Sequence, residues 1–372
     1  MNKGIIAVLG AVAIIGMLAL YALKQGPALL LKPPPEQRIA FVSDRGGSPD
    51  IWTMKTDGSA AKQVTNDSAD DQIPSWSPDA KQIVSISDRL NQIYQIFVSA
   101  WDGRYVHCMT SSEATKDVPV WRADGGEITF ISGGKVSGIK SSGGREEQYL
   151  PLSSIPGATI SEGVRYVFGA WSPDNSYLFY VRETDRGKEL YAAEKDDLMT
   201  AAEEQDKPED VKPVGIPITL ARNLSVSVAP KKSAIAVSFI DQGGRNGVHV
   251  ADLSSVEDQD LYIFPDNKHA AGKVAWSPDG KQIAFEVWTM EGDTPNMPDG
   301  IYTIKASGGK PRLLIGGDAR EPTWSPDGRQ LACTVMSEND KRDIWRMNAD
   351  GTGAVNLTKG QGDSYNPAWS PR

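Results

Sequence analysis

Residues 324–333 read Trp-Ser-Pro-Asp-Gly-Arg-Gln-Leu-Ala-Cys, a turn followed by a short apolar segment. Proline fixes φ, aspartate bonds the local backbone and glycine accepts a positive φ, so Ser-Pro-Asp-Gly predicts a tight turn. The alternating apolar residues after it are typical of a strand. The Trp-Ser-Pro-Asp motif recurs from positions 76, 171, 276 and 324, with Trp-Arg-Ala-Asp at 121, Trp-Ser-Pro-Arg at 369 and a degenerate Val-Ala-Pro-Lys at 228.

The copies follow one another at intervals of 45, 50, 57, 48, 48 and 45 residues. Periods of this size are typical of four-stranded propeller blades, whereas helical arrays repeat every ~33–34 residues. Each unit adds a third strand, such as residues 50–54 and 343–347, and a fourth strand that often ends in Thr. The recurrent tryptophan is expected to pack between neighbouring blades. We therefore predict an all-β, seven-bladed β-propeller over residues 38–372.

The phase of the repeat predicts how the ring closes. The chain enters the propeller on a second strand near Arg38, and its last residues follow a first strand that ends at Trp369. The C-terminal strand should therefore complete blade 1, which would remove the open sheet edge that invites aggregation.

These motifs resemble the TolB-type family of WD-repeat-like propellers, whose repeat is built on Trp-Ser-Pro-Asp-Gly. The resemblance covers about nine-tenths of the chain and implies the fold more strongly than a function, because propellers carry many activities. It implies a protein-binding role outside the cytoplasm. Related propellers precede serine-peptidase domains, but no such domain is expected in this sequence.

Residues 4–23 form an uncharged apolar run between Lys3 and Lys24. A helix of this length crosses the ~30 Å hydrocarbon core of a bilayer. We expect residues 1–24 to be an uncleaved signal anchor and residues 25–37, with three consecutive prolines, to be an extended linker. The alternative is a signal peptide that is cleaved, giving a secreted protein. The flanking charges are nearly balanced, so the expected orientation, with the propeller outside, rests on the usual behaviour of signal anchors.

Composition narrows the function classes. Acidic residues outnumber basic ones 48 to 39, which argues against a nucleic-acid binder. There are only two cysteines and three histidines, so we expect no cofactor and no metal centre. Cys108 and Cys333 are assigned to different blades, and we predict that they form no disulfide.

No catalytic group of residues emerges from the sequence. It has no Gly-x-Ser-x-Gly nucleophile motif. Oligogalacturonate lyases resemble this repeat type and use clustered histidine ligands, but His107, His249 and His269 are assigned to blades 2, 5 and 6. The acidic stretch 66–71 lacks the pattern of a calcium loop and favours turn chemistry. Insertions at 197–212 and 291–299 are interpreted as mobile loops, with a functional role as the alternative.

The loops that enter the innermost strands should surround the mouth of the central channel. We predict that this rim contacts a ligand through eight residues: Asp70, Asp71, Asp117, Arg165, Tyr166, Arg320, Asp363 and Tyr365.

The leading hypothesis is a non-catalytic propeller on the outer side of the cytoplasmic membrane that binds a protein or peptide. One alternative is a propeller lyase or hydrolase acting on an acidic polysaccharide. The other is a structural scaffold of a membrane complex.

Overall fold

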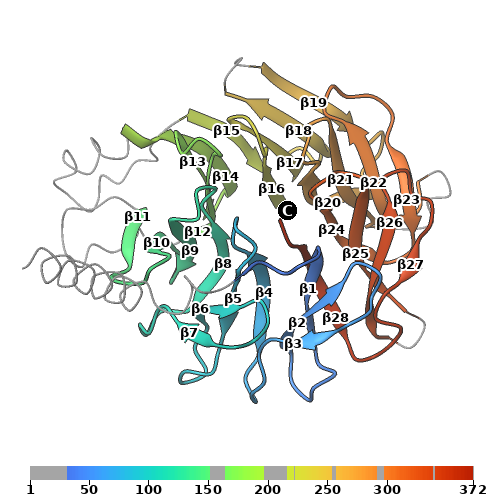
Figure 1. Ribbon diagram of the computed structural model, residues 1–372. Coiled ribbons are helices and arrows are strands. Elements are labelled where there is room, and N and C mark those ends of the chain that lie inside the picture. The colour runs from blue at the N-terminus through green and yellow to red at the C-terminus, as the bar shows by residue number, and fades with distance from the viewer. Residues whose placement is uncertain are drawn as a thin grey trace, which may run out of the picture.

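The computed structural model describes residues 32–150, 164–196, 216–221, 223–253, 257–290, 297–337 and 340–371. Within these ranges the strands form seven four-stranded antiparallel sheets arranged as the blades of a ring (Figure 1). The all-β, seven-bladed prediction is confirmed. Within the same ranges no helix has the length and apolar character needed to cross a bilayer. The predicted anchor at residues 1–24 and most of the predicted linker lie outside the described part.

The strands of blades 1 to 4 have the following bounds. Blade 1 contains β1 (Arg38–Ser43), β2 (Asp50–Lys55), β3 (Lys62–Gln63) and β28 (Ser364–Trp369). Blade 2 contains β4 (Asp71–Trp76), β5 (Gln82–Ser87), β6 (Gln95–Ala100) and β7 (Val106–Cys108). Blade 3 contains β8 (Lys116–Trp121), β9 (Glu127–Ser132), β10 (Lys135–Lys140) and β11 (Glu147–Leu150). Blade 4 contains β12 (Arg165–Trp171), β13 (Tyr177–Thr184), β14 (Gly187–Glu194) and β15 (Ile216–Ala221).

The remaining blades follow in chain order. Blade 5 contains β16 (Asn223–Val228), β17 (Ala234–Ile240), β18 (Asn246–Asp252) and β19 (Glu257–Ile263). Blade 6 contains β20 (His269–Trp276), β21 (Gln282–Thr289), β22 (Gly300–Lys305) and β23 (Arg312–Gly316). Blade 7 contains β24 (Ala319–Trp324), β25 (Gln330–Met336), β26 (Arg342–Asn348) and β27 (Val355–Asn356).

The ring closes as the phase of the repeat predicts. Strand β28 pairs antiparallel with β1, with Trp369 opposite Ile39 and Ser364 opposite Ser43. The last described strand therefore completes the first blade.

Two faces of the ring are distinguished by their connections. The face that carries the turns between first and second strands, including the Ser-Pro-Asp turns, is called the turn face. The face that carries the loops entering the first strands is called the mouth face. Arg38 begins β1 opposite Lys55, the end of β2, so the described chain enters the ring at the turn face.

The core lies between the blades. Each of seven buried apolar clusters among the described residues joins one blade to the next. Five motif tryptophans also donate their indole N–H to a backbone carbonyl in the first strand of the preceding blade, at 3.0 to 3.2 Å. They are Trp76, Trp121, Trp276, Trp324 and Trp369. Blade 4 departs from this pattern, because Nε1 of Trp171 is buried without an acceptor in the part of the chain that the structure describes.

The repeated polar residues hold the local turns. In the Ser-Pro-Asp turn of blade 2, Ser77 Oγ donates to Asp79 and accepts the N–H of Gln82 at 3.0 Å. The Thr that follows a fourth strand accepts an N–H from the third: Thr358 Oγ1 accepts the Ile344 N–H at 3.0 Å. These contacts explain why the two polar residue types recur with the strands.

Candidate functional site

The first strands are bulged close to the mouth face. Pairing with the second strand shifts register by the same step in blades 1, 2, 3 and 7. In each of these blades the residue before a proline adopts a positive φ of 47 to 58°. The four residues are Ile73, Val118, Glu321 and Asn366. A positive φ is costly for non-glycine residues, and such strain persists only where surrounding contacts enforce it.

Two glutamates supply such contacts on one side of the mouth. Glu286 on β21 accepts the backbone N–H of Glu321 at 2.6 Å and that of Lys273 at 3.1 Å. Glu321 in turn accepts the N–H of Asn366 at 2.7 Å and the hydroxyl of Thr334 at 2.6 Å. Carboxylates that accept backbone N–H groups make strong, charge-assisted bonds. Blades 6, 7 and 1 are thereby joined by one hydrogen-bonded set, called here the polar arc (Glu286, Glu321, Thr334 and Asn366).

Glu286 is the more enclosed of the two glutamates of the arc, with 6 % of its surface exposed. Burial raises the pKa of its carboxyl group, and the two backbone N–H bonds oppose that shift. A Cβ atom on Gly272 would lie 2.1 Å from Glu286 Oε2, so this position requires a glycine. The Gly272 carbonyl also accepts the hydroxyl of Ser238 at 2.5 Å, which extends the contacts to blade 5.

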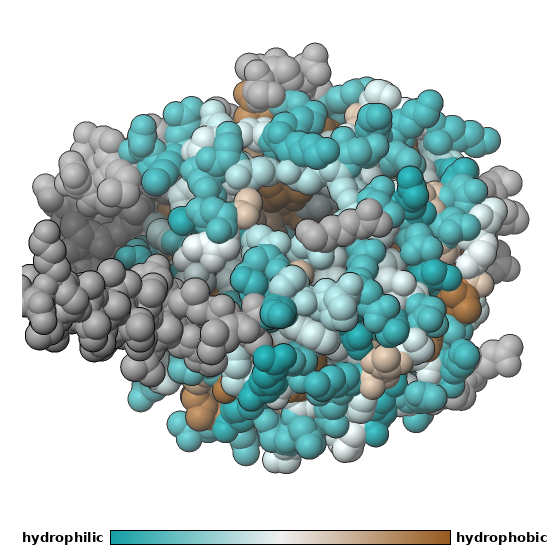
Figure 2. Space-filling model, in the orientation of Figure 1, coloured by the Kyte–Doolittle hydropathy of each residue, from teal (hydrophilic) through white to brown (hydrophobic). Residues whose placement is uncertain are grey.

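Across the ring, the position that matches Glu286 carries aliphatic residues, which pack between the blades. The fifth residue of each second strand is polar in blades 5, 6 and 7, namely Ser238, Glu286 and Thr334. In blades 1 to 4 it is Val42, Ile86, Ile131 and Val181. The matching position is therefore polar on one side of the ring and aliphatic on the other. Figure 2 shows the turn face, which is hollowed near the centre of the ring, with apolar residues inside and hydrophilic residues around it.

A second set of contacts joins blades 7, 1 and 2. Tyr365 donates its hydroxyl to Gln72 Oε1 at 3.2 Å. The Arg342 guanidinium lies 3.7 Å from the centre of the Tyr365 ring and forms an ion pair with Asp363. That contact lowers the pKa of the Asp363 carboxyl group, whereas burial raises the pKa of Tyr365. Asp363 and Tyr365 are thus brought together, as part of a fixed array.

Arg320 belongs to the neighbouring part of the rim. Its guanidinium pairs with Asp318 at 2.6 Å and lies over the ring of Trp288 at 5.0 Å. Both contacts leave Arg320 partly exposed. An arginine held over an aromatic ring offers a positioned cation at the mouth.

The other predicted rim residues divide by exposure. Asp117 and Arg165 are exposed, and Arg165 pairs with Glu183 at 2.5 Å. Asp70 is half-buried. Asp71 is fully buried and bonds to Arg89 at 2.8 and 2.9 Å. Arg89 also pairs with Asp67, so this arginine holds much of the acidic stretch 66–71.

Tyr166 packs in the apolar cluster between blades 3 and 4, and burial raises its pKa to about 12. Asp71 and Tyr166 therefore stabilise the fold and present no surface to a ligand.

The histidines have separate environments. His107 is exposed on β7, His249 pairs with Asp260 at 2.9 Å, and His269 pairs with Asp266 at 2.8 Å. His269 is the buried first residue of β20, in blade 6. In the ranges the structure describes, no three His, Cys, Asp or Glu side chains form a group able to hold a metal ion. Both cysteines are free thiols, as predicted.

Five arc and rim residues were not predicted from the sequence: Gln72, Glu286, Glu321, Thr334 and Asn366. A signal was present for Glu321 and Asn366, since each precedes a proline two residues before a motif tryptophan. The sequence holds a comparable signal for Glu286, because the polar residues at the fifth position of the second strand are confined to three consecutive blades.

Comparisons with known proteins agree with this architecture. The family described as TolB beta propeller domain matches residues 27–209. Among solved structures, TolB from Acinetobacter baumannii aligns with a TM-score of 0.55 and 19% identity, over 90% of this chain and 67% of that chain. An oligogalacturonate lyase in complex with manganese aligns with a TM-score of 0.58 and 9% identity, over 87% of this chain and 85% of that one. A puromycin hydrolase aligns with a TM-score of 0.56 and 11% identity, over 77% and 46% respectively. No curated protein matches.

Proposed function

We propose that this chain, whose residues 27–209 match the family described as TolB beta propeller domain, is a non-catalytic binding module whose mouth face receives a protein or peptide. The proposal includes attachment to the cytoplasmic membrane through residues 1–24, with the propeller on the outer side. The similar solved structures include a TolB and also enzymes, so the choice between binding and catalysis rests on the residues of this chain.

The proposal rests on how the two carboxylates at the mouth, Glu286 and Glu321, are hydrogen-bonded. Glu286 and Glu321 each accept two hydrogen bonds, at least one of them from the backbone of the next blade. A general acid or base must be free to exchange a proton with a substrate, and a nucleophile must reach one. Glu286 and Glu321 are instead hydrogen-bonded to the protein's own backbone, so they fix the shape of a binding surface. The Arg320 guanidinium, held over Trp288, adds a charged contact that a protein or peptide can use.

The point at which the chain enters the ring gives the proposed orientation. Lys32 and Arg38 lie at the turn face, where Trp101 Nε1 donates to the Lys32 carbonyl at 2.9 Å and Glu36 pairs with Lys55 at 2.9 Å. The end of the predicted linker is therefore bound to the propeller. An anchor upstream of Lys32 would direct the turn face toward the membrane and the mouth face away from it.

Photo-crosslinking tests the binding role. A crosslinking amino acid placed at Asp117 or Arg165 in the full-length chain should capture a protein from membranes, and the same residue at Lys310 on the turn face is the matched control. The variant Arg320→Glu should reduce capture about tenfold, in line with the loss of a well-placed charged contact. Capture that depends on Lys310 and not on the mouth positions would refute the proposal.

Turnover distinguishes the enzymatic alternative. The full-length protein should not cleave polyuronate or peptide panels at a median enzymatic rate of ~10 s⁻¹. Such turnover, lost in Glu321→Gln and retained in Lys310→Gln, would establish an enzyme instead. A structural scaffold of a membrane complex would give two other results. The partner complex should still be captured after it is solubilised in detergent, and capture should be lost in a variant that lacks residues 1–31.

A further inference from the structure

The turn face carries one repeated site at each junction between blades, and two junctions can be compared residue by residue. Arg38 donates its backbone N–H to Ser370 Oγ at 2.9 Å, and Gln82 donates to Ser77 Oγ at 3.0 Å. Arg38 of blade 1 and Gln82 of blade 2 therefore occupy the same position of the repeat.

The facing residues on the next blade match in the same way. Trp101 follows the third strand of blade 2, and its N–H binds the Lys81 carbonyl at 3.1 Å. Ser141 follows the third strand of blade 3, and its N–H binds the Gly126 carbonyl at 2.9 Å. Trp101 and Ser141 are equivalent residues of consecutive blades.

At the junction of blades 1 and 2 the chain fills this site with its own indole. Trp101 packs against the buried cluster that contains Trp76 and Ala80. The Arg38 guanidinium lies 5.4 Å from the centre of the Trp101 ring, and the indole N–H binds the Lys32 carbonyl. A tryptophan placed in this way covers ~150–250 Å² of surface.

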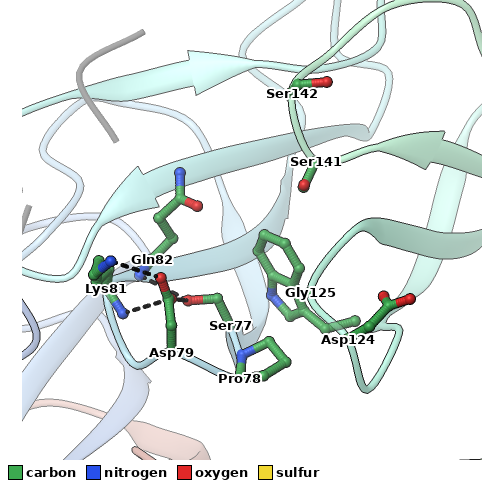
Figure 3. Close-up of a pocket in the computed structure, with 10 residues that line it drawn as sticks. Ser77, Pro78, Asp79, Lys81, Gln82, Asp124, Gly125, Ser141 and Ser142 are labelled. Atoms are coloured by element: carbon green, nitrogen blue, oxygen red, sulfur yellow. Dashed lines mark hydrogen bonds and ion pairs between the residues drawn. The ribbon is translucent and has the colours of Figure 1, made fainter. Parts of the chain in front are cut away.

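At the junction of blades 2 and 3 the same site is open. Serine replaces the tryptophan, Gly125 stands where blade 2 has Ala80, and Gln82 replaces the arginine. The result is a cavity of about 280 Å³ lined by ten residues: Ser77, Pro78, Asp79, Lys81, Gln82, Trp121, Asp124, Gly125, Ser141 and Ser142. Figure 3 shows Gln82 and Lys81 on one side of it, and Ser141 and Ser142 on the other, with the Ser141 hydroxyl toward the cavity.

We propose that this cavity is a docking site for an indole side chain presented by a partner protein. The occupied junction shows which group the site is shaped for, because the two junctions share the same backbone contacts and each of the three replacements at the open one removes side-chain volume. The guest ring would lie against Trp121, as Trp101 lies in the cluster with Trp76. Hydroxyl and amide oxygens of Ser141, Ser142 and Gln82 border the cavity and are able to accept its N–H. The site is separate from the mouth face and does not depend on the function proposed there.

Protection from alkylation provides the direct test. The full-length variant Ser141→Cys is treated with a small maleimide, and modification of the peptide containing residue 141 is followed by mass spectrometry. N-acetyl-tryptophanamide at millimolar concentration should slow this modification at least threefold, whereas N-acetyl-leucinamide should not. Ala306→Cys, at the equivalent position of blade 6, is the matched control and should not be slowed. Equal protection at both positions, or none at residue 141, would overturn the proposal.

Filling the cavity provides an independent test. In the variant Ser141→Trp the chain would supply its own ring, as blade 2 does, and binding of 5-fluoroindole measured by ¹⁹F NMR should fall at least tenfold. Ser141→Ala keeps the cavity open and should bind within twofold of the unmodified protein. Unchanged 5-fluoroindole binding in a folded Ser141→Trp variant would refute the assignment. If Ser141→Trp does not fold, the alkylation test decides alone.

Discussion

Replacing a motif tryptophan by phenylalanine should have a different cost in blade 7 and in blade 4. Trp324 is 6 % exposed and donates its indole N–H to the Ala275 carbonyl of blade 6 at 3.1 Å. Trp171 holds the matching position of blade 4, but its N–H has no acceptor among the described residues. The same substitution therefore removes the same atoms from two sites, and only one of them loses a hydrogen bond.

The magnitudes follow from these contacts. Trp324→Phe loses ring contacts and leaves a small cavity, a cost of about 1–2 kcal/mol. The lost hydrogen bond adds about 1 kcal/mol, for a total of roughly 2–3 kcal/mol. Trp171→Phe loses fewer contacts, because Trp171 is only half-buried, and it removes a polar group that is buried without a partner. Its cost should be about 1 kcal/mol or less, since removing such an N–H relieves a desolvation penalty.

Urea unfolding of the full-length variants in a mild detergent, followed by far-UV circular dichroism, measures both free energies of unfolding. Trp276→Phe is the control for Trp324→Phe, because its indole makes the same bond, to Ser227 at 3.0 Å. Equal destabilisation by Trp324→Phe and Trp171→Phe would refute the argument that the indole bonds help to hold neighbouring blades together.

Other substitutions test the polar arc and the strand contacts. Gly272→Ala should destabilise the fold by about 1–3 kcal/mol, because its Cβ would lie 2.1 Å from Glu286 Oε2, whereas Gly316→Ala, with no atom closer than 3.8 Å, should change little in the same unfolding assay. Thr358→Val should cost about 1–3 kcal/mol in thermal and urea unfolding, because the buried Ile344 N–H loses its acceptor. The raised pKa of Glu286 means that its contribution to stability is complete below its unfolded pKa of ~4.3 and is lost as the pH rises through the folded value. The free energy of unfolding of the unmodified protein, relative to Glu286→Gln, should therefore fall as the pH rises above ~4.3, and a constant difference would contradict this assignment.

The repeat predicted the ring because its turn chemistry and strand period recur in phase over the whole propeller. Seven sets of strands and the completion of blade 1 by β28 follow directly from counting those turns. The predicted rim was less accurate at residue level. Strict alternation counted back from the buried Trp76 places Gln72 inside and Asp71 outside.

The bulge between Gln72 and Ser75 reverses that order, so Asp71 is buried and Gln72 reaches Tyr365. Bulges of this kind depend on contacts between blades, such as those of Glu286. The alternation of residues within one strand therefore cannot predict them.

The pairing of β1 with β28 also determines how the ring would respond to a mechanical load. Arg38 and Trp369 lie at the same end of two paired strands of one sheet, with Ile39 directly opposite Trp369. Tension applied between the two ends of the chain would open this pair from that edge one hydrogen bond at a time, as a zipper opens, rather than load all the bonds at once. The β1–β28 pair, which closes the ring, should therefore be the first part of it to separate under pulling. In force spectroscopy with handles at the two termini, blade 1 should unfold before any other blade.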